Sequence, residues 1–362
     1  MKYLFFVQTD GRGHMTQALA LKEKLEVRGH QVIGVIVGSK KGRQIPSFFT
    51  EQITCPFFVL ESPKFLTDKK NKGVRIFVSS LITISRIFKY IASIKEIKKI
   101  INNLQPDILI NFYEPLAGNY YRFFRDKRPM FCIGHHHFIE HPAFKFPEIS
   151  LLARFSFRFY NRLTAGSRTT KIALSFTKEN DYSKKKLLVC PPLIRKSFKK
   201  APPNDKKYLL VYLLNSGYSE EIINWNQKNP NYNIEAFWDK TEEENTKISD
   251  TLVFHRLSGE KFIDCLINCS AYASTAGFDS IAEAAYLQKN ILMIPTKNQF
   301  EQKCNVADAE RAGIAISANY FDISRLISEE RKVRSKIGLI KFKDWVDKND
   351  NKIVDILEGN FS

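Results

Sequence analysis

The sequence predicts an α/β protein made of two doubly wound domains, each a mostly parallel sheet with helices on both faces. Three observations support this prediction. The chain has 362 residues, which exceeds the usual size of one hydrophobic core. Short apolar blocks alternate with amphipathic helical patterns through the first half, and a similar alternation restarts near residue 207. The segment CPPLIRKSFKKAPPNDKK between them is rich in proline and lysine and has no apolar period.

The first half shows the clearer alternation. Its expected strands are short blocks of Ile, Val, Phe and Leu bounded by turn residues, at 3–8, 31–37, 54–59, 107–111, 129–133 and 171–175. Apolar residues at helical spacing predict helices at 15–28, 77–103, 117–125 and 146–162. This alternation favours a parallel sheet, because each helix carries the chain back to the start of the next strand.

The second half repeats the pattern. YLLVYLLNSGYSEE predicts a strand, a turn at Asn215, Ser216 and Gly217 and a helix start, and further strands are expected at 233–237, 251–254, 271–273, 291–294 and 314–316. We therefore expect a Rossmann-like N-terminal domain at 1–195, a linker at 196–206, a Rossmann-like C-terminal domain at 207–345 and a helix or tail at 346–362. Because ligands bind beyond the carboxyl ends of such strands, a cleft between the two domains is the expected site.

The composition is that of a globular protein, with 44% hydrophobic and 26% charged residues. The most apolar stretch, 76–85, has ten residues, whereas a membrane-spanning helix needs about 20. The apolar run at 3–7 is too short for the core of a signal peptide, and the six cysteines include no CxxC pair. We therefore expect a cytoplasmic protein with reduced thiols.

The charge is distributed unevenly. Residues 1–200 hold 36 Lys and Arg against 14 Asp and Glu, a net charge of +22, whereas residues 201–362 have a net charge of −4. A basic half suggests a polyanionic partner such as acidic lipid headgroups, a pyrophosphate carrier or nucleic acid, although a solubilising surface would have the same composition. The sequence contains no helix-turn-helix, zinc-finger or RNA-binding aromatic signature, so nucleic acid is not an expected partner.

The most specific motif is STAGFDSIAEAAYLQKNILMIPTKNQFEQKCNVADAERAGIAI, at 274–316. It begins with a strand-to-helix turn, where backbone N–H groups suit a pyrophosphate, formed by Ser274, Thr275, Ala276 and Gly277. Glu283 follows about two turns into the helix, where a carboxylate suits ribose hydroxyls. After the next strand, Glu301, Gln302 and Asn305 offer the donors and acceptors that a sugar needs. Ordinary helix capping is the alternative for each alone, but the ordered combination disfavours it.

This order of strand, turn, helical Glu, strand-Pro and Glu-Gln-x-x-Asn resembles the donor-binding half of GT-B nucleotide-sugar glycosyltransferases. The resemblance covers about residues 1–345 and is closest to the MurG-like family, which transfers N-acetylglucosamine to a lipid-linked peptidoglycan precursor. It implies that Glu283 binds the ribose, that 274–277 face the diphosphate and that Glu301 and Gln302 contact the sugar, with Asn305 completing the motif. The segment LVFHRLSG matches the part that contacts uracil through backbone groups, which places Phe254 and His255 at the base.

The sequence departs from the family pattern at two points. The family usually has Gly-Gly where this chain has Ala276 and Gly277, and it has more glycine in the loop that reads Asn215, Ser216 and Gly217 here. These departures concern the phosphate contacts, and either a different donor or a weakened site would explain them. The resemblance implies a nucleotide sugar, linked to uridine diphosphate, as co-substrate. It implies no further cofactor and no metal.

The N-terminal loop FVQTDGRGHMTQALAL allows three interpretations: a phosphate cradle, a catalytic base on a turn, or a plain strand-to-helix loop. It lacks the third glycine of a dinucleotide-binding fingerprint. Gly11 and Gly13 permit the close backbone approach of a tight turn, and His14 titrates in the range that suits a general base. The loop resembles the family's Gly-x-Gly-His stretch. We therefore expect His14 to be the base or to orient the acceptor, with Gly11 and Gly13 making room for the acceptor.

A carboxylate often orients such a base. Glu114, which follows the expected strand in ILINFYEPLAG, is the first candidate. Asp10 is the second, with a turn-forming role as its alternative.

Four histidines occur within seven residues of FCIGHHHFIEHPAF. The helical spacing of His137 and His141 allows a metal site, but no acidic ligand motif accompanies them. We expect instead a loop that lines the acceptor pocket, with His135 and His137 as acceptor-binding residues and no metal.

Two basic amphipathic segments suggest an anionic membrane surface as a partner. GVRIFVSSLITISRIFKYIASIKEIKKI predicts a long helix with an apolar face, for which core packing is the alternative. In LLARFSFRFYNRL, Arg154, Arg158 and Arg162 recur at every fourth position and share one helix face with aromatic residues around it. That face suits phosphate or lipid headgroups, although a solvated helix would have the same pattern.

Together these observations predict an inverting, metal-independent glycosyltransferase that acts on a lipid-linked or surface-glycan acceptor. We expect it in the cytoplasm, peripheral on the inner face of the membrane. One alternative is a nucleotide-sugar 2-epimerase on the same fold, which would leave the basic half unexplained. The other is a degenerate, non-catalytic homologue that binds an anionic membrane.

Overall fold

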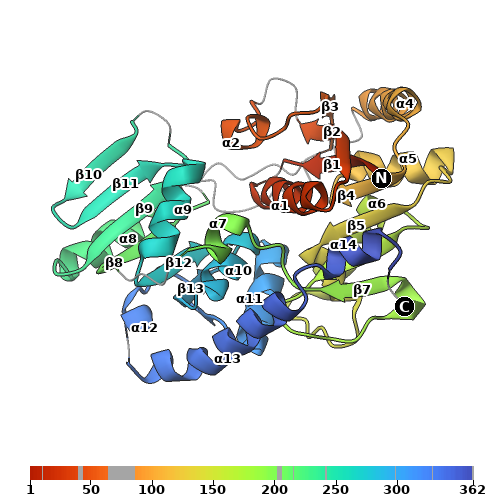
Figure 1. The fold of residues 1–362 in the computed structure, drawn as a ribbon. Coiled ribbons are helices and arrows are strands. Elements are labelled where there is room, and N and C mark those ends of the chain that lie inside the picture. Colours follow the sequence, from red (N-terminus) through yellow and green to blue (C-terminus); the bar gives the residue numbers. More distant parts are fainter. Residues whose placement is uncertain are drawn as a thin grey trace. The chain divides into compact units, whose positions relative to one another are not determined.

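The computed structural model describes residues 1–9, 11–39, 44–63, 86–201, 206–214, 216–240, 243–297, 299–327 and 329–360. The chain divides into two compact units, each built around one sheet with helices (Figure 1). The predicted fold class, α/β with two doubly wound domains, is confirmed.

The first unit runs to Leu193 and also includes the residues from Asn349 onward. Its described strands form a parallel sheet in the order β3-β2-β1-β4-β5-β6-β7. The strands are β1 Lys2–Gln8, β2 Gln31–Ser39, β3 Phe57–Glu61, β4 Ile108–Phe112, β5 Met130–Gly134, β6 Thr170–Leu174 and β7 Leu187–Cys190. The helices are α1 Gly13–Val27, α2 Ser47–Thr50, α4 Ile87–Leu104, α5 Pro115–Phe124, η1 His135–Glu140, α6 Leu151–Ala165, η2 Ser183–Lys185 and α14 Lys352–Leu357.

The core of the first unit follows from its apolar periodicity. β1 lies between β2 and β4, and its side chains from Leu4 to Val7 are fully buried, as expected for a central parallel strand. α4 buries Ile94, Ile97 and Ile101, which are three or four positions apart, against β4 and α5. α5 and α6 approach closely at Gly118, where a Cβ atom would lie 2.3 Å from the carbonyl oxygen of Thr164. A glycine is therefore required at this crossing.

The C-terminal helix α14 packs against α1 of the first unit. Arg28 at the end of α1 pairs with Asp355 at 2.9 Å and with Glu358 at 3.2 Å. Val354 and Leu357 on α14 are buried. The last described residues thus complete the first unit, although they follow the second in the sequence.

The second unit spans Ile194–Lys348 among the described residues. Its sheet has the order β10-β11-β9-β8-β12-β13-β14, in which β10 is antiparallel to β11 and the other neighbours are parallel. The strands are β8 Tyr208–Tyr212, β9 Asn233–Trp238, β10 Asn245–Ser249, β11 Leu252–Arg256, β12 Ala271–Thr275, β13 Asn290–Ile294 and β14 Ile316–Ser317. The helices are α7 Lys196–Lys199, η3 Ser216–Tyr218, α8 Ser219–Lys228, α9 Gly259–Asn268, α10 Asp279–Tyr286, α11 Phe300–Ala312, α12 Ser324–Ile327 and α13 Glu329–Lys348.

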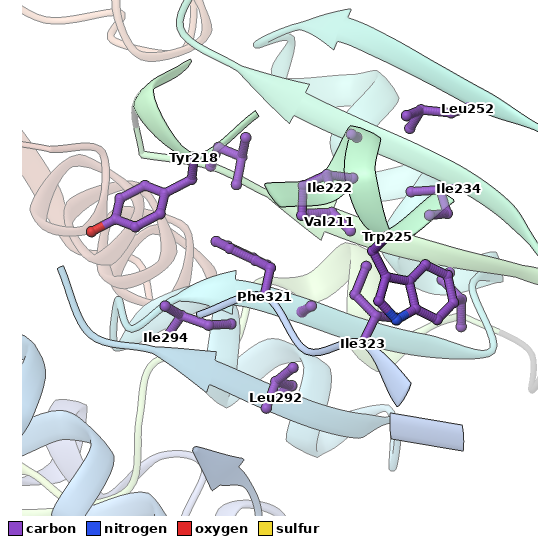
Figure 2. Packing of buried hydrophobic residues seen from close by; sticks show 14 of the residues in the cluster. Val211, Tyr218, Ile222, Trp225, Ile234, Leu252, Leu292, Ile294, Phe321 and Ile323 are labelled. Atoms are coloured by element: carbon purple, nitrogen blue, oxygen red, sulfur yellow. The ribbon is translucent and has the colours of Figure 1, made fainter. Parts of the chain in front are cut away.

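One apolar cluster fills a face of this second sheet (Figure 2). Ile222 and Trp225 of α8 pack there with Phe321 and Ile323, and side chains of the strands, such as Val211 and Leu292, complete the cluster. Trp225 also donates to the hydroxyl of Ser324 at 2.9 Å, so its one polar group is paired within the core. This packing fixes the strands whose ends carry the expected donor-binding residues.

The expected elements match the observed ones closely, with three differences. Strand β7 was not expected, and neither was the edge strand β10. The expected linker at 196–206 contains α7, whose Phe198 is buried. Of the expected helix at 77–103, the structure describes α4 from Ile87, and residues 77–85 lie outside the described residues. Within the described chain, no helix combines the length and apolar character needed to cross a bilayer.

Candidate functional site

Each sheet reverses its strand order at one point. In the first unit β1 and β4 are neighbours, and in the second β8 and β12 are neighbours. In doubly wound sheets, the loops that leave two such strands diverge to opposite sides, and ligands bind beyond the carboxyl ends of those strands. The sequence-predicted residues lie mainly in these loops.

The loop after β1 makes a tight turn into α1. Thr9 donates its hydroxyl hydrogen bond to the carbonyl of Gly38 at 2.7 Å, and Gly11 has a φ of +85°, which favours glycine. Helix α1 begins at Gly13, so His14 lies in its first turn and is largely buried. Asp10, the second expected carboxylate partner, lies outside the described residues.

The ring of His14 belongs to a cluster of stacked rings. It lies parallel to the ring of Tyr113, with centroids 5.5 Å apart, and 5.3 Å from the ring of His136. Tyr113 and His136 stack directly, at 3.9 Å and 18°. The loops after β1, β4 and β5 therefore bring one ring each to a common point. Sequence reasoning selected His14 but not Tyr113 or His136 as site residues.

Glu114, the predicted orienting carboxylate, caps the N-terminus of α5 and is fully buried. Its Oε1 atom accepts from the backbone N–H of Leu116 at 3.1 Å and from the hydroxyl of Ser62 at 2.5 Å. A Cβ atom at Gly38 would lie 1.8 Å from its Oε2 atom, so only glycine fits beside this carboxyl group. These contacts place Glu114 beside the ends of β2 and β3, and its action on His14 stays a prediction.

The remaining histidines have different surroundings. His135 is buried, donates from Nδ1 to the carbonyl of Leu174 at 2.7 Å, and packs against Phe176. His141 is bound through Nε2 to the carbonyl of Asn180 at 2.9 Å. Complete burial, followed by the positive charge of Lys171, holds the pKa of His137 well below its usual range. Of the consecutive histidines, His136 is the one that stacks on Tyr113 next to His14.

Asn161, Glu140 and Lys171 form a polar chain in the first unit. Asn161 donates through Nδ2 to Oε1 of Glu140 at 3.0 Å. Glu140 pairs in turn with Lys171 at 2.6 Å. Among the described residues, no group of three or more His, Cys, Asp or Glu side chains is arranged to hold a metal ion.

In the second unit, the loop after β12 carries the expected diphosphate contact. Ser274 and Thr275 are buried, and the backbone N–H groups of Ala276 and Gly277 donate to the carbonyls of Ile294 at 3.1 Å and Thr275 at 2.6 Å. Helix α10 begins at Asp279. The N–H groups that have no acceptor within a helix are those of its first turn. The assignment of Ser274, Thr275, Ala276 and Gly277 to the diphosphate stays a prediction.

Glu283, the expected ribose ligand, lies on α10 with 2% of its side chain exposed. The guanidinium of Arg195 holds it in a two-point contact, from Nε to Oε1 at 2.6 Å and from Nη2 to Oε2 at 2.7 Å. Burial alone would lower the pKa of Arg195, but the negative charge of Glu283 and the hydrogen bonds to it outweigh burial and raise that pKa. Sequence reasoning did not select Arg195.

The loop after β13 carries the expected sugar contacts. The backbone N–H of Thr296 donates to Oε1 of Gln302 at 2.6 Å, which fixes the plane of the amide. Asn305 is buried and donates to the carbonyl of Ala276 at 3.0 Å, so α11 is tied to the loop after β12. Glu301 lies in the first turn of α11 and is partly exposed.

The loop after β8 joins the same edge of the sheet. The backbone N–H of Leu214 donates to the hydroxyl of Thr275 at 3.1 Å, and that of Ser216 donates to Asp239 at 2.7 Å. Gly217 lies in η3. Asn215 lies outside the described residues. The loops after β8, β12 and β13 are thus connected by hydrogen bonds at the point where the strand order reverses.

Phe254 and His255, expected at the base, lie within β11. Phe254 is buried and stacks on Trp238 with centroids 4.3 Å apart. The ring of His255 is bound between Asn245, at 2.6 Å, and Glu235. Because β11 pairs with β10 on one side and β9 on the other, the backbone groups of both residues belong to the sheet. The first backbone beyond the strand is at Leu257 and Ser258.

Comparisons with known proteins agree with this geometry. The family described as Glycosyl transferase family 1 matches residues 1–330. Among curated proteins, no sequence matches at a significant level. Solved structures with the same fold include a Phytolacca americana protein, UGT2, complexed with UDP-2-fluoro-glucose and pterostilbene, at 11% identity, 99% coverage of both chains and a TM-score of 0.64.

Two further solved structures have the same fold. MurG of Acinetobacter baumannii has 12% identity over 97% of this chain and all of its own, with a TM-score of 0.58. The spinosyn rhamnosyltransferase SpnG, complexed with thymidine diphosphate, has 10% identity over 99% of this chain and all of its own, with a TM-score of 0.59. At such identities the likeness shows the fold alone.

Proposed function

Because the chain belongs to glycosyl transferase family 1, we propose that it is an inverting, metal-independent glycosyltransferase. It takes the sugar from a uridine diphosphate sugar and transfers it to a hydroxyl of a lipid-linked or surface-glycan acceptor. The observation that carries this proposal is a pair of hydrogen bonds. Leu214 after β8 donates to Thr275 at the end of β12, and Asn305 of α11, the helix after β13, donates to Ala276 in the loop after β12. Loops that are already joined by hydrogen bonds lose little conformational freedom when they bind a flexible diphosphate sugar. We call these loops of the second unit the donor loops.

We assign each part of the donor to residues in or next to these donor loops. The diphosphate binds at the turn from Ser274 to Gly277 that leads into α10, where the helix dipole favours negative charge. Glu283 binds the ribose through lone pairs that Arg195 does not occupy, because an ionised carboxylate has about four acceptor positions. Glu301 and Gln302 bind the sugar. The uracil meets the backbone just after β11, next to Phe254 and His255.

The acceptor half of the reaction is assigned to the first unit. His14 takes the proton from the acceptor hydroxyl while the oxygen of that hydroxyl attacks the anomeric carbon of the donor sugar. The bond from that carbon to the diphosphate oxygen breaks, the nucleoside diphosphate leaves with the electron pair, and the configuration inverts. Gly11 and Gly13 leave room for the acceptor beside His14. His135 and His137 line the acceptor pocket, and His136 lies between them in the sequence and stacks on Tyr113 beside His14.

We further propose that the first unit rests on an anionic membrane. Helix α6 leaves an apolar row exposed, with Leu151 82%, Leu152 76%, Phe155 68% and Phe159 54% accessible. Arg154 and Arg158 lie beside this row, with their guanidiniums 4.0 and 5.1 Å from the ring of Phe146. An exposed apolar row flanked by cations is the pattern of an interfacial helix, and residues 1–200 have a net charge of +22.

A thermal-shift screen with UDP, TDP, GDP and their sugars tests the donor, because a ligand that binds only the native state raises its melting temperature. Transfer from the stabilising nucleotide sugar to an undecaprenyl-pyrophosphate-linked sugar then tests the reaction.

His14→Ala should abolish transfer with little change in donor affinity. Turnover by this variant at the parent rate would refute the base assignment. A new sugar isomer formed without any acceptor would indicate an epimerase instead.

Flotation with phosphatidylglycerol vesicles and with phosphatidylcholine vesicles tests the membrane surface. We expect the parent to float with the anionic vesicles only, and Leu151→Ser with Phe155→Ser to stay in the soluble fraction. Phe123→Ser, an exposed apolar residue on α5, is the matched control. Equal flotation of all three proteins would refute the assignment to α6.

A further inference from the structure

Tyr113 has an unusual backbone conformation for a buried residue. It follows β4 directly and has a φ of 60°, in the left-handed region that side chains with a Cβ atom rarely adopt. Among the described residues, the other non-glycine residues with positive φ are exposed: Gln105, Arg125, Lys186 and Gln288. Such conformations persist only where the surroundings enforce them, and they cluster at functional sites. This one lies where the strand order reverses.

This conformation places the Tyr113 ring against two imidazoles. The ring stacks on His136 at 3.9 Å and lies nearly parallel to His14 at 5.5 Å, with an interplanar angle of 22°. Tyr160 of α6 meets it edge-on at 5.9 Å. Each ring comes from a different loop or helix, so the stack forms only when all of these segments are folded. The plane of the His14 imidazole is therefore set by its neighbours.

The face of a phenol ring carries partial negative charge and attracts a cation within about 6 Å of its centroid. His14 becomes a cation at the moment when it accepts a proton. The other titratable groups in this cluster are His136 and His137 of η1 and the hydroxyl of Tyr160. Tyr113 thus offers a neutral, polarisable face to His14.

We propose that Tyr113 is a positioning residue for His14: its ring fixes the plane of the imidazole and stabilises the positive charge that His14 acquires during transfer. This inference rests on the proposed role of His14 as the base. The strained backbone at Tyr113 is then the means by which a large aromatic ring reaches the imidazole from the end of β4.

The proposal is tested first without any substrate. The imidazole nitrogens are titrated by NMR in the full-length parent, Tyr113→Phe and Tyr113→Leu, with His14 assigned from a His14→Gln variant. Leucine keeps the site apolar and fills similar space but removes the aromatic face. We expect Tyr113→Leu to move the His14 titration midpoint down by about half a pH unit or more, and Tyr113→Phe to keep the parent value. Equal midpoints in all three proteins would overturn the proposal.

The second measurement is kinetic and separates this proposal from the proposed function. The probe is release of UDP from UDP-N-acetylglucosamine, with water as acceptor. We expect Tyr113→Leu to lower kcat about tenfold with an unchanged KM, and Tyr113→Phe to retain the parent kcat. If His14→Ala is inactive but Tyr113→Leu turns over like the parent, the positioning role is refuted and the base assignment stands. If His14→Ala is as active as the parent, the base assignment fails and the positioning role fails with it.

Tyr113→Met replaces the leucine variant in both measurements if Tyr113→Leu does not fold, as judged by its melting temperature.

Discussion

The guanidinium of Arg195 donates hydrogen bonds to both carboxylate oxygens of Glu283, at 2.6 and 2.7 Å, although the two residues are 88 positions apart in the sequence. The Glu283 side chain is almost fully buried, and Arg195 is also close to the ring of Phe198, 4.9 Å from its centroid. A buried carboxylate without such a partner would be strongly unfavourable. The first residues of the second unit are thus attached to the helix that we assign to ribose binding.

Breaking this pair should destabilise the second unit. We expect Arg195→Met to lower its free energy of unfolding by about 3–5 kcal/mol, because an unpaired charge stays buried. Arg195→Met with Glu283→Leu should recover most of that loss, since an apolar pair has no charge to desolvate. Urea unfolding is followed by tryptophan fluorescence, because Trp225, Trp238 and Trp345 all lie in this unit.

The control for this prediction is Arg325→Met, which removes a more exposed ion pair with Asp322 in the same unit. Such pairs contribute about 0–1 kcal/mol. A double variant as unstable as Arg195→Met alone would show that the loss comes from packing of the arginine side chain and not from the buried charge.

Gly38 is predicted to tolerate no side chain. A Cβ atom there would lie 1.8 Å from Oε2 and 2.3 Å from Cδ of Glu114. Gly38→Ala should therefore lower the stability of the first unit by at least about 1–3 kcal/mol, the usual cost of overpacking. The double variant with Glu114→Ala should be more stable than Gly38→Ala alone, because the clashing carboxyl group is gone. Urea unfolding followed by circular dichroism measures both.

Gly29→Ala is the matched control, because Gly29 has a φ of +77° but no atom within 4 Å of a Cβ position. It adds backbone strain without a clash. If Gly38→Ala and Gly29→Ala have equal stability, the close approach of Glu114 to β2 is refuted.

The sequence predicted most strands because apolar blocks bounded by turn residues are strong local signals. It missed β7 because the apolar block Leu187–Cys190 has four residues and stands between a run of lysines and two prolines, so it gives a weak strand signal. It missed β10 for a different reason. The segment NTKIS has no apolar block, and its strand conformation depends on pairing with β11.

The site was predictable to the level of loops but not of individual side chains. Three consecutive histidines give no sign of which ring turns toward His14, because that depends on the turn after β5. Tyr113 gave no signal either, since tyrosine is not a residue type that predicts positive φ. The contact of Arg195 with Glu283 is set by tertiary structure and has no local pattern. Sequence reasoning therefore found the motif residues and missed the residues that hold them.

The cysteines should react unequally in the folded protein. Burial raises the pKa of the Cys132 thiol to about 12 and that of Cys265 to about 11. Cys190, Cys269 and Cys304 are also buried, and Cys55 is partly exposed. Because the thiolate is the reactive form, iodoacetamide at pH 8 should modify at most Cys55 in the native state and all six after unfolding. Mass spectrometry of the labelled peptides checks this, and rapid labelling of Cys132 would contradict its burial at β5.

The contact between α14 and α1 should make the first unit sensitive to acid. A hydrogen bond from His30, and then the charge of Arg28, hold the pKa of Glu358 below its usual range. In the unfolded chain the pKa of a glutamate is about 4.3. Glu358 therefore binds a proton more readily in the unfolded chain than in the folded one. The stabilisation is fully present above that pH and is lost as the pH falls through the lower, folded pKa.

Glu358→Gln should be less stable than the parent at pH 7, and the difference should shrink toward pH 3. Urea unfolding at several pH values measures this, with Glu148→Gln, an exposed carboxylate of the same unit, as control. A stability difference between Glu358→Gln and the parent that did not change with pH would refute the ionic role of Glu358.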